Sequence, residues 1–151
     1  MKVVKAAAVQ LSPVLYSREG TIDKVVRTIH ALGQQGVQFA TFPETVVPYY
    51  PYFSFLQPAY QIVAGCEHLK LLDQAVTVPS PATHAIGDAC KEAGVVVSIG
   101  VNERDGGTLS NTQLLFDSRR RLDPAAPQNL AHLSRAHDLG PGRRLRPACR
   151  R

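Results

Sequence analysis

The chain has 151 residues, which is enough for one domain with a hydrophobic core or for part of a larger one. No stretch contains the roughly 18 apolar residues that a membrane-spanning helix requires, so we expect no membrane partner. Three cysteines, Cys66, Cys90 and Cys149, have no CxxC spacing. This pattern argues against a disulfide framework or a zinc site and favours a cytoplasmic location.

The net charge of +5 comes entirely from the C-terminal part of the chain. Residues 1–118 hold eight Lys and Arg and ten Asp and Glu, a net charge of −2. Residues 119–151 hold nine Arg and two Asp, a net charge of +7. Because basic segments often bind nucleic acid or acidic membranes, this asymmetry needs an explanation before a function is assigned.

The N-terminal third has the pattern of a strand, a helix and a second strand. Residues 3–11, "VVKAAAVQL", are almost continuously apolar and predict a buried strand, and residues 37–42 predict another. Between them, residues 17–36 have the spacing of an amphipathic helix with Gly36 at its C-terminal end. Its apolar stripe is Ile22, Val25, Val26, Ile29 and Leu32. This order predicts a parallel pair of strands.

The middle of the chain contains a long segment rich in proline and aromatic residues, from Pro43 to about Pro81. We expect it to be irregular and to line a pocket or an interface. Residues 81–94 predict a second amphipathic helix, and 95–101 a buried strand. A turn at Gly106–Gly107 leads to a strand over 111–117, antiparallel to the one before it.

A single carboxylate, Glu44, follows the strand in "FATFPETVVPYYPYFSF", residues 39–55. A rigid strand below it and apolar, aromatic surroundings would make it an effective general base. The alternative is a solvated residue at the end of a strand. Tyr50 is the candidate for substrate contact, although the nearby aromatic residues are equally compatible with loop packing or a dimer contact.

Residues 1–117 resemble the nitrilase branch of the carbon–nitrogen hydrolase superfamily. The resemblance rests on "AAVQLSPV", "FPETVVPYYPYFSF", "VTVPSP" and "GVNERDGGTLSNTQLLFD", in that order. It departs from the family at Ser110, where Tyr is usual. The resemblance implies the N-terminal part of an α/β fold, an α-β-β-α sandwich, acting without a metal or an organic cofactor.

The resemblance also implies a Glu, Lys and Cys catalytic set. The Cys thiolate attacks a nitrile carbon to form a thioimidate, Glu is the general base, and Lys stabilises the developing charge. Of the three, only Glu44 can be carried over to this sequence. The family's Lys and Cys segments should follow residues 111–117 and are missing. None of the three cysteines follows a strand as a nucleophile would, so we interpret them as core residues or incidental thiols.

The composition changes abruptly after Asp117, and residues 119–151 contain no Val, Ile, Phe, Tyr, Met, Lys or Glu. Reading each codon from its second base, with permitted synonymous choices, turns residues 123 to about 145 into "IQRRRKISPTYHERMIWGQGDGSG". That is the missing family segment, with the catalytic Lys across Gln128 and Asn129. We interpret residues 118–151 as an out-of-frame, irregular or disordered tail whose charge carries no information about partners.

The sequence therefore predicts a partial carbon–nitrogen hydrolase domain, residues 1–117, followed by this tail. The predicted full-length enzyme converts an organic nitrile to a carboxylic acid and ammonia and forms a homo-oligomer, whereas the present chain is expected to be inactive. The alternatives are an amidase or carbamoylase of the same superfamily and a non-catalytic nucleic-acid-binding protein. Without the later strands and the facing sheet, one face of residues 95–101 and the edge beside residues 111–117 are expected to be open.

Overall fold

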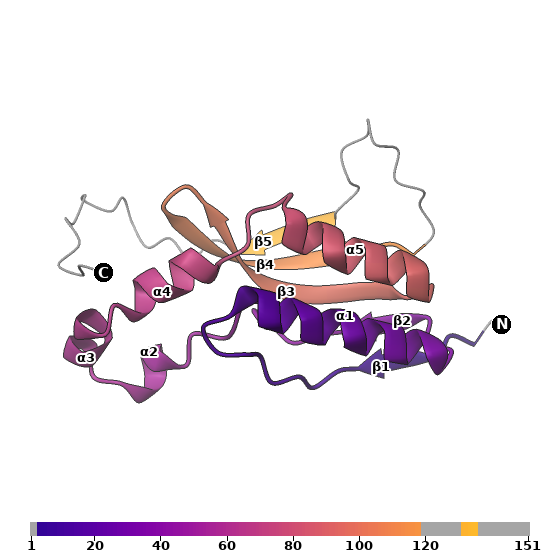
Figure 1. Cartoon of the computed structure of the whole chain (residues 1–151), viewed down its shortest axis with the longest axis horizontal. Helices are drawn as coiled ribbons and strands as arrows, with labels where there is room; N and C mark the ends of the chain where they lie inside the picture. Colours follow the sequence, from indigo (N-terminus) through magenta and orange to yellow (C-terminus); the bar gives the residue numbers. More distant parts are fainter. Residues whose placement is uncertain (1–2, 119–130, 136–151) are drawn as a thin grey trace.

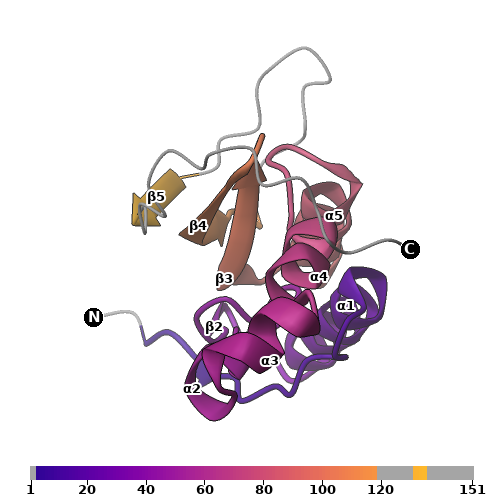
Figure 2. The same ribbon diagram turned by 90° about the vertical axis from the view of Figure 1, so that its left-hand side faces the viewer.

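A single mixed sheet forms the centre of the molecule, and two helices cover one of its faces (Figures 1 and 2). The computed structural model describes residues 3–118 and 131–135. The strands lie in the order β1–β2–β3–β4–β5. Their bounds are β1 Ala6–Ala8, β2 Phe39–Thr41, β3 Val96–Asp105, β4 Thr108–Phe116 and β5 Ala131–Arg135, and the covering helices are α1, Arg18–Gln34, and α5, Pro81–Ala93.

The predicted strand–helix–strand unit at the N-terminus is confirmed. β1 pairs with β2 and β2 with β3, both in parallel, so that Ala7, Ala40 and Val97 lie in register. α1 connects the first two strands, and its N-cap Ser17 accepts a hydrogen bond from the backbone of Gly20 at 3.0 Å. The predicted apolar stripe of α1 packs onto the core, with Ile22, Val25 and Ile29 buried and Val26 and Leu32 partly buried.

The predicted hairpin is also confirmed, and it is longer than the sequence indicates. β3 and β4 pair antiparallel from Val97↔Phe116 to Asp105↔Thr108, with Gly106–Gly107 in the turn. β3 continues four residues past the predicted end at Val101. Two residues outside the named strands bridge to this end of β3. Val47 pairs with Val101, and Val76 pairs with Glu103.

The main hydrophobic core lies between the sheet and the pair α1 and α5. Among its fully buried side chains are Val25, Ile29, Val97, Ile99 and Leu114. The two helices approach closely where Gly33 of α1 faces Ala93. A Cβ atom at Gly33 would lie 2.6 Å from the Ala93 carbonyl oxygen, so glycine permits this contact. The core fixes the strand ends from which the candidate site is built.

The first strand is shorter and more exposed than the sequence predicts. β1 spans three residues, and Val3 and Val4 before it are 92% and 59% exposed. The prediction of a buried strand over residues 3–11 is therefore wrong for the described chain. β1 is at the edge of the sheet and pairs only with β2, and the two covering helices lie on one face only.

Residues 43–81, predicted to be irregular, contain three short helices that extend beyond one end of the sheet (Figure 1). They are α2, Phe53–Leu56, α3, Ala59–Ala64, and α4, Glu67–Gln74. They form because Phe53, Ile62 and Leu71, one from each helix, bury their side chains with Tyr49 in a second hydrophobic cluster. Each helix is too short to show the repeating apolar pattern by which helices are recognised in a sequence.

The tail was predicted to be irregular and the edge of β4 to be open, and both expectations are corrected by β5. Residues 131–135 pair antiparallel with β4, from Asn111↔Arg135 to Leu115↔Ala131. Pairing through backbone N–H and C=O groups makes little demand on side chains, so a segment without a β-rich composition can occupy an open strand edge. The rest of the predicted tail, residues 119–130 and 136–151, lies outside the described residues.

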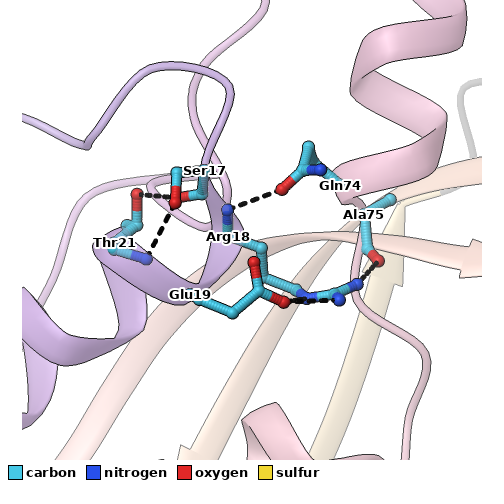
Figure 3. Close-up of polar contacts among 7 residues, drawn as sticks. Ser17, Arg18, Glu19, Thr21, Gln74 and Ala75 are labelled. Atoms are coloured by element: carbon cyan, nitrogen blue, oxygen red, sulfur yellow. Dashed lines mark hydrogen bonds and ion pairs between the residues drawn. The ribbon is translucent and has the colours of Figure 1, made fainter.

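The start of α1 is bonded to the end of α4 (Figure 3). The Arg18 backbone N–H donates to Gln74 Oε1 at 2.7 Å, and the Arg18 guanidinium donates to the Ala75 carbonyl oxygen at 3.1 Å. The same guanidinium pairs with Glu19 at 2.7 Å. These contacts satisfy polar groups that helix ends otherwise leave free, and they attach the α4 region to the main body of the protein.

The cysteines behave differently from one another. Cys90 on α5 is a free, fully buried thiol, as expected of a core residue, and burial raises its pKa to about 12. Cys66, at the N-cap of α4, is disulfide-bonded, so the expectation of free thiols is wrong at this position.

Within residues 3–118 and 131–135, no helix has the length and apolar character needed to cross a membrane, and no three His, Cys, Asp or Glu side chains form a metal-binding group.

Candidate functional site

The predicted base, Glu44, lies in a turn three residues after the end of β2 at Thr41. The backbone around Glu44 stays beside the sheet after β2 ends, because residues 43–47 run along β3. The Gly100 N–H donates to the Pro43 carbonyl oxygen at 3.2 Å, and the Asn102 N–H donates to that of Val47 at 2.7 Å. The turn that carries Glu44 is therefore fixed on both sides by hydrogen bonds to one central strand.

Gly100 of β3 brings the sheet into direct contact with this turn. A Cβ atom at Gly100 would lie 2.4 Å from the Thr45 backbone nitrogen and 2.6 Å from Glu44 Cα. No side chain fits at that distance, so the close approach of the turn requires glycine. Thr45 itself has φ +44° and is buried, an unfavourable conformation for a β-branched residue. The surrounding structure holds Glu44 in a constrained position.

The Glu44 carboxylate is oriented by an amide from β4. Asn111 Nδ2 donates a hydrogen bond to Glu44 Oε1. The Glu44 side chain is otherwise exposed, so the enclosing apolar surroundings predicted from the sequence are not present in the described part of the chain. The aromatic residues Tyr50 and Phe55 instead line an open cavity together with Glu44.

A cavity of about 380 Å³ contains both of the site residues predicted from the sequence. Its polar lining residues are Glu44, Thr45, Ser54, His68, Asn102, Ser110 and Asn111. Its apolar and aromatic lining residues are Tyr50, Pro51, Phe55, Leu71 and Leu109. The structure thus brings Glu44 and Tyr50 together at one cavity, with Ser110, where the family usually has Tyr, beside them.

The wall formed by α4 is anchored by a buried carboxylate that the sequence analysis did not identify. Glu67 is 6% exposed; its carboxylate accepts hydrogen bonds from Tyr16 Oη and from Lys70 Nζ, each at 2.9 Å. The hydrogen bond from Lys70 lowers the pKa of Glu67 against the opposing effect of burial. The ammonium of Lys70 also lies 5.2 Å from the centre of the Tyr16 ring. This group joins the segment before α1 to the helix that carries His68 and Leu71.

We expect Glu67 to make the free energy of unfolding of the chain depend on pH in the acidic range. Because its pKa is lower in the folded state, it stabilises the fold above the ordinary Glu pKa, and that contribution disappears as pH falls through the lowered value. Between pH 6 and pH 3, the free energy of unfolding should fall more steeply for the original chain than for Glu67→Gln. The difference in slope should stay below about 1.4 kcal/mol per pH unit. Urea titrations at several pH values measure it.

The matched control for this measurement is Glu92→Gln, because the Glu92 side chain is 69% exposed on α5. This variant should keep the original slope, since a surface ion pair with His30 contributes little. Equal slopes for the original chain and Glu67→Gln would show that the Glu67 carboxylate is not held in its ionised form by the fold.

A second cavity, of about 430 Å³, lies between the starts of α1 and α5. It includes Arg18, Glu19 and Ser80. The Arg18 guanidinium there is already paired with Glu19. Neither Glu44 nor Tyr50 lines this cavity, so we assign the candidate site to the cavity beside Glu44.

The sequence analysis missed several residues that build this site. Asn111 and Gly100 lie within sequence blocks that carried the family resemblance, but a sequence does not show which strand faces a turn. His68 lies on α4, where no helix was expected. Neither Cys66 nor Cys90 is among the residues that line the cavity.

Comparisons with known proteins identify relatives of this chain. The family model for carbon–nitrogen hydrolases matches residues 5–150. Nitrilase 3 from an unknown prokaryotic organism is 72% identical over 131 residues, which is 82% of this chain and 40% of that protein. A nitrilase from Paraburkholderia phymatum is 46% identical over 130 residues, 82% of this chain and 38% of that protein. The chain thus spans about two fifths of the length of these curated relatives.

Solved structures share the fold at low sequence identity. A CN-hydrolase superfamily protein from Xanthomonas campestris superimposes with a TM-score of 0.59 at 18% identity, covering 91% of this chain and 42% of that one. The NitN amidase from Neterenkonia sp. AN1 gives 0.55 at 17% identity, covering 92% and 46%. The predicted α/β, nitrilase-like fold is confirmed by these similarities.

The chain belongs to the carbon–nitrogen hydrolase family. The family model covers nearly all of it, and its fold is similar to that of a solved CN-hydrolase superfamily protein. Within the family, its similarity to curated nitrilases puts it in the nitrilase branch, as the sequence motifs predicted.

Proposed function

We propose that the whole protein is a nitrilase, which hydrolyses an organic nitrile to a carboxylic acid and ammonia. The observation that carries this proposal is the position of Glu44. Its carboxylate borders the cavity and is oriented by Asn111, and its turn is pressed against Gly100. The motif around it occurs in a chain 72% identical to a curated nitrilase.

In this proposal Glu44 is the general base. It removes the proton from a cysteine thiol that attacks the nitrile carbon. It later activates one water, which releases ammonia from the thioimidate and leaves a thioester, and a second water, which releases the carboxylic acid and restores the thiol. A carboxylate suits this work when it is held rigidly within reach of the proton that it accepts. Tyr50, on the aromatic side of the cavity, contacts the substrate. The Lys and Cys of the set belong to the part of the family sequence that follows residue 117.

The present chain is proposed to be inactive because it carries only one of the three catalytic groups. Groups that act as a unit leave little activity when any of them is lost. We attribute the loss to a change of reading frame near Ser118. In support, the composition changes abruptly after Asp117. The cytoplasmic location and the homo-oligomeric state of the whole protein remain predictions.

Two alternatives stay open. An amidase or carbamoylase of the same superfamily would use the same Glu44, but the relatives at 72% and 46% identity are named as nitrilases. A nucleic-acid-binding protein would depend on the basic residues 119–151, which have none of the interleaved aromatic residues typical of single-strand binding. Salt-dependent DNA binding by the whole chain, lost in residues 1–117, would favour this second alternative.

The proposed function is tested by restoring the reading frame near codon 118. A shift of one nucleotide should open a longer coding sequence with a cysteine downstream. The protein it encodes should release ammonia and the acid from nitriles, whereas the 151-residue chain should release no more ammonia than its Glu44→Ala variant. Aliphatic and aryl nitriles, each with the matching amide, form the substrate panel.

Three outcomes would contradict parts of this proposal. A stop codon within a few codons of the shift would exclude the frameshift. Ammonia released from the amides but not from the nitriles would favour the amidase. Ammonia released from nitriles by the 151-residue chain itself would mean that the missing Lys and Cys are not required.

A further inference from the structure

The cavity beside Glu44 is lined by two chemically different sets of side chains. The polar set includes the Glu44 carboxylate and the Asn111 amide, which are hydrogen-bonded to each other, and Asn102, which is 6% exposed. The aromatic set consists of the rings of Tyr50 and Phe55. A cavity of this kind suits a ligand with a polar group at one end and an apolar body at the other.

The apolar side of this cavity is aromatic and partly preassembled. The rings of Tyr50 and Phe55 stack with their centres 6.2 Å apart and an angle of 21° between their planes. Tyr50 is also in contact with Tyr52, with ring centres 4.9 Å apart. Tyr50 is therefore in contact with two other aromatic rings.

Phe55 is largely in contact with solvent, because it is 73% exposed. An exposed phenylalanine that lines a cavity and stacks on a fixed tyrosine offers a large apolar surface to a ligand. Phe53, two residues earlier, contributes instead to the buried cluster of Tyr49, Ile62 and Leu71. The two phenylalanines of α2 thus have different surroundings, and Phe55 is the one at the cavity.

The charges around the cavity favour an uncharged ligand. Among the described residues that line it, Glu44 is the acidic side chain, and there is no Lys or Arg. In this chain, a ligand with a carboxylate would therefore meet the negative charge of Glu44 with no Lys or Arg in the described lining to pair with it. The volume of about 380 Å³ is within the range of about 300 to 1,000 Å³ found for small-molecule sites.

We propose that this cavity binds an aromatic nitrile, with its ring against Phe55 and Tyr50 and its nitrile group toward Glu44 and Asn111. Phe55 is then the residue that favours an aromatic over a saturated substrate. The inference rests on the proposed function, which gives the ligand its nitrile group. An added aromatic contact corresponds to about a two- to twelvefold gain in affinity.

The test compares two neutral nitriles of the same size, benzonitrile and cyclohexanecarbonitrile, which differ in the aromaticity of the ring. Each is titrated into the 151-residue chain, and dissociation constants are measured from the amide chemical shifts of residues 44–55. Benzonitrile is expected to bind about two- to twelvefold more tightly. Equal affinities, tighter binding of cyclohexanecarbonitrile, or no binding of either would overturn the proposal.

Variants show whether Phe55 causes the difference in affinity between the two nitriles. Phe55→Leu keeps an apolar side chain but removes the ring, so the preference for benzonitrile should disappear while cyclohexanecarbonitrile binds as before. The control is Tyr60→Leu, since Tyr60 is similarly exposed, at 70%, lies on α3 and does not line the cavity. A preference retained in Phe55→Leu, or lost equally in Tyr60→Leu, would overturn the role of Phe55. Thermal unfolding of each variant checks that the fold is intact.

Failure of this inference is distinguishable from failure of the proposed function, because binding is measured without turnover. If the frame-restored protein hydrolyses nitriles but the cavity shows no aromatic preference, the function stands and the inference is wrong. If benzonitrile binds as expected but the frame-restored protein hydrolyses only amides, the proposed function is wrong and the aromatic preference of the cavity stands.

Discussion

Replacing Glu44 by alanine in the frame-restored protein is expected to lower kcat for nitrile hydrolysis by roughly 10²- to 10⁴-fold, the usual contribution of a general base. The structure gives the reason. The carboxylate is held at the cavity by the Asn111 amide and by a turn that packs on Gly100, and it is the only acidic side chain among the described residues that line the cavity. Ammonia release at saturating nitrile measures the effect.

Two further variants isolate the basicity of Glu44 from its other contacts. Glu44→Gln retains an oxygen that accepts the hydrogen bond from Asn111 but cannot take up a proton, so it should lose as much activity as Glu44→Ala. Glu92→Ala removes an exposed carboxylate from α5, away from the cavity, and should leave kcat unchanged. Substantial activity in Glu44→Gln would mean that the residue acts through its hydrogen bond and not as a base.

The parts of the fold that were predicted correctly are those with a repeating pattern. The α1 stripe runs from Ile22 to Leu32, about three helical turns, and β3 and β4 are separated by an unambiguous turn at Gly106–Gly107. Helices α2 to α4 have four to eight residues each, and their formation depends on burial with Tyr49 in a separate cluster. Such burial is a property of the folded chain and not of the local sequence.

The residues of the candidate site likewise fall into some that were predicted from the sequence and some that were not. Glu44 and Tyr50 were found from a contiguous motif and do line one cavity. Asn111 is 67 residues away from Glu44 in the chain, and its contact exists only because β4 folds back beside β3. The contact made by Gly100 similarly depends on where residues 43–47 run after leaving β2. The identity of the base was therefore predictable, whereas the groups that position it were not.

Replacing Gly100 by alanine is expected to destabilise the chain by about 3 kcal/mol, at the upper end of the usual cost of overpacking. The added methyl group would lie 2.4 Å from the Thr45 backbone nitrogen and 2.6 Å from Glu44 Cα. These are backbone atoms, so no side-chain rotation can relieve the clash, and the turn must move away from β3. Denaturant unfolding of the two chains measures the difference in the free energy of unfolding.

The matched control is Gly107→Ala, because a Cβ atom at Gly107 would have no atom within 4 Å. We expect this change to alter stability by less than about 0.5 kcal/mol, as is usual at open surface positions. In the frame-restored protein, Gly100→Ala should also lower kcat, since moving the turn separates Glu44 from Asn111, whereas Gly107→Ala should not. If both variants unfold at the same denaturant concentration as the original chain, the turn is not pressed against β3, and Gly100 does not determine the position of Glu44.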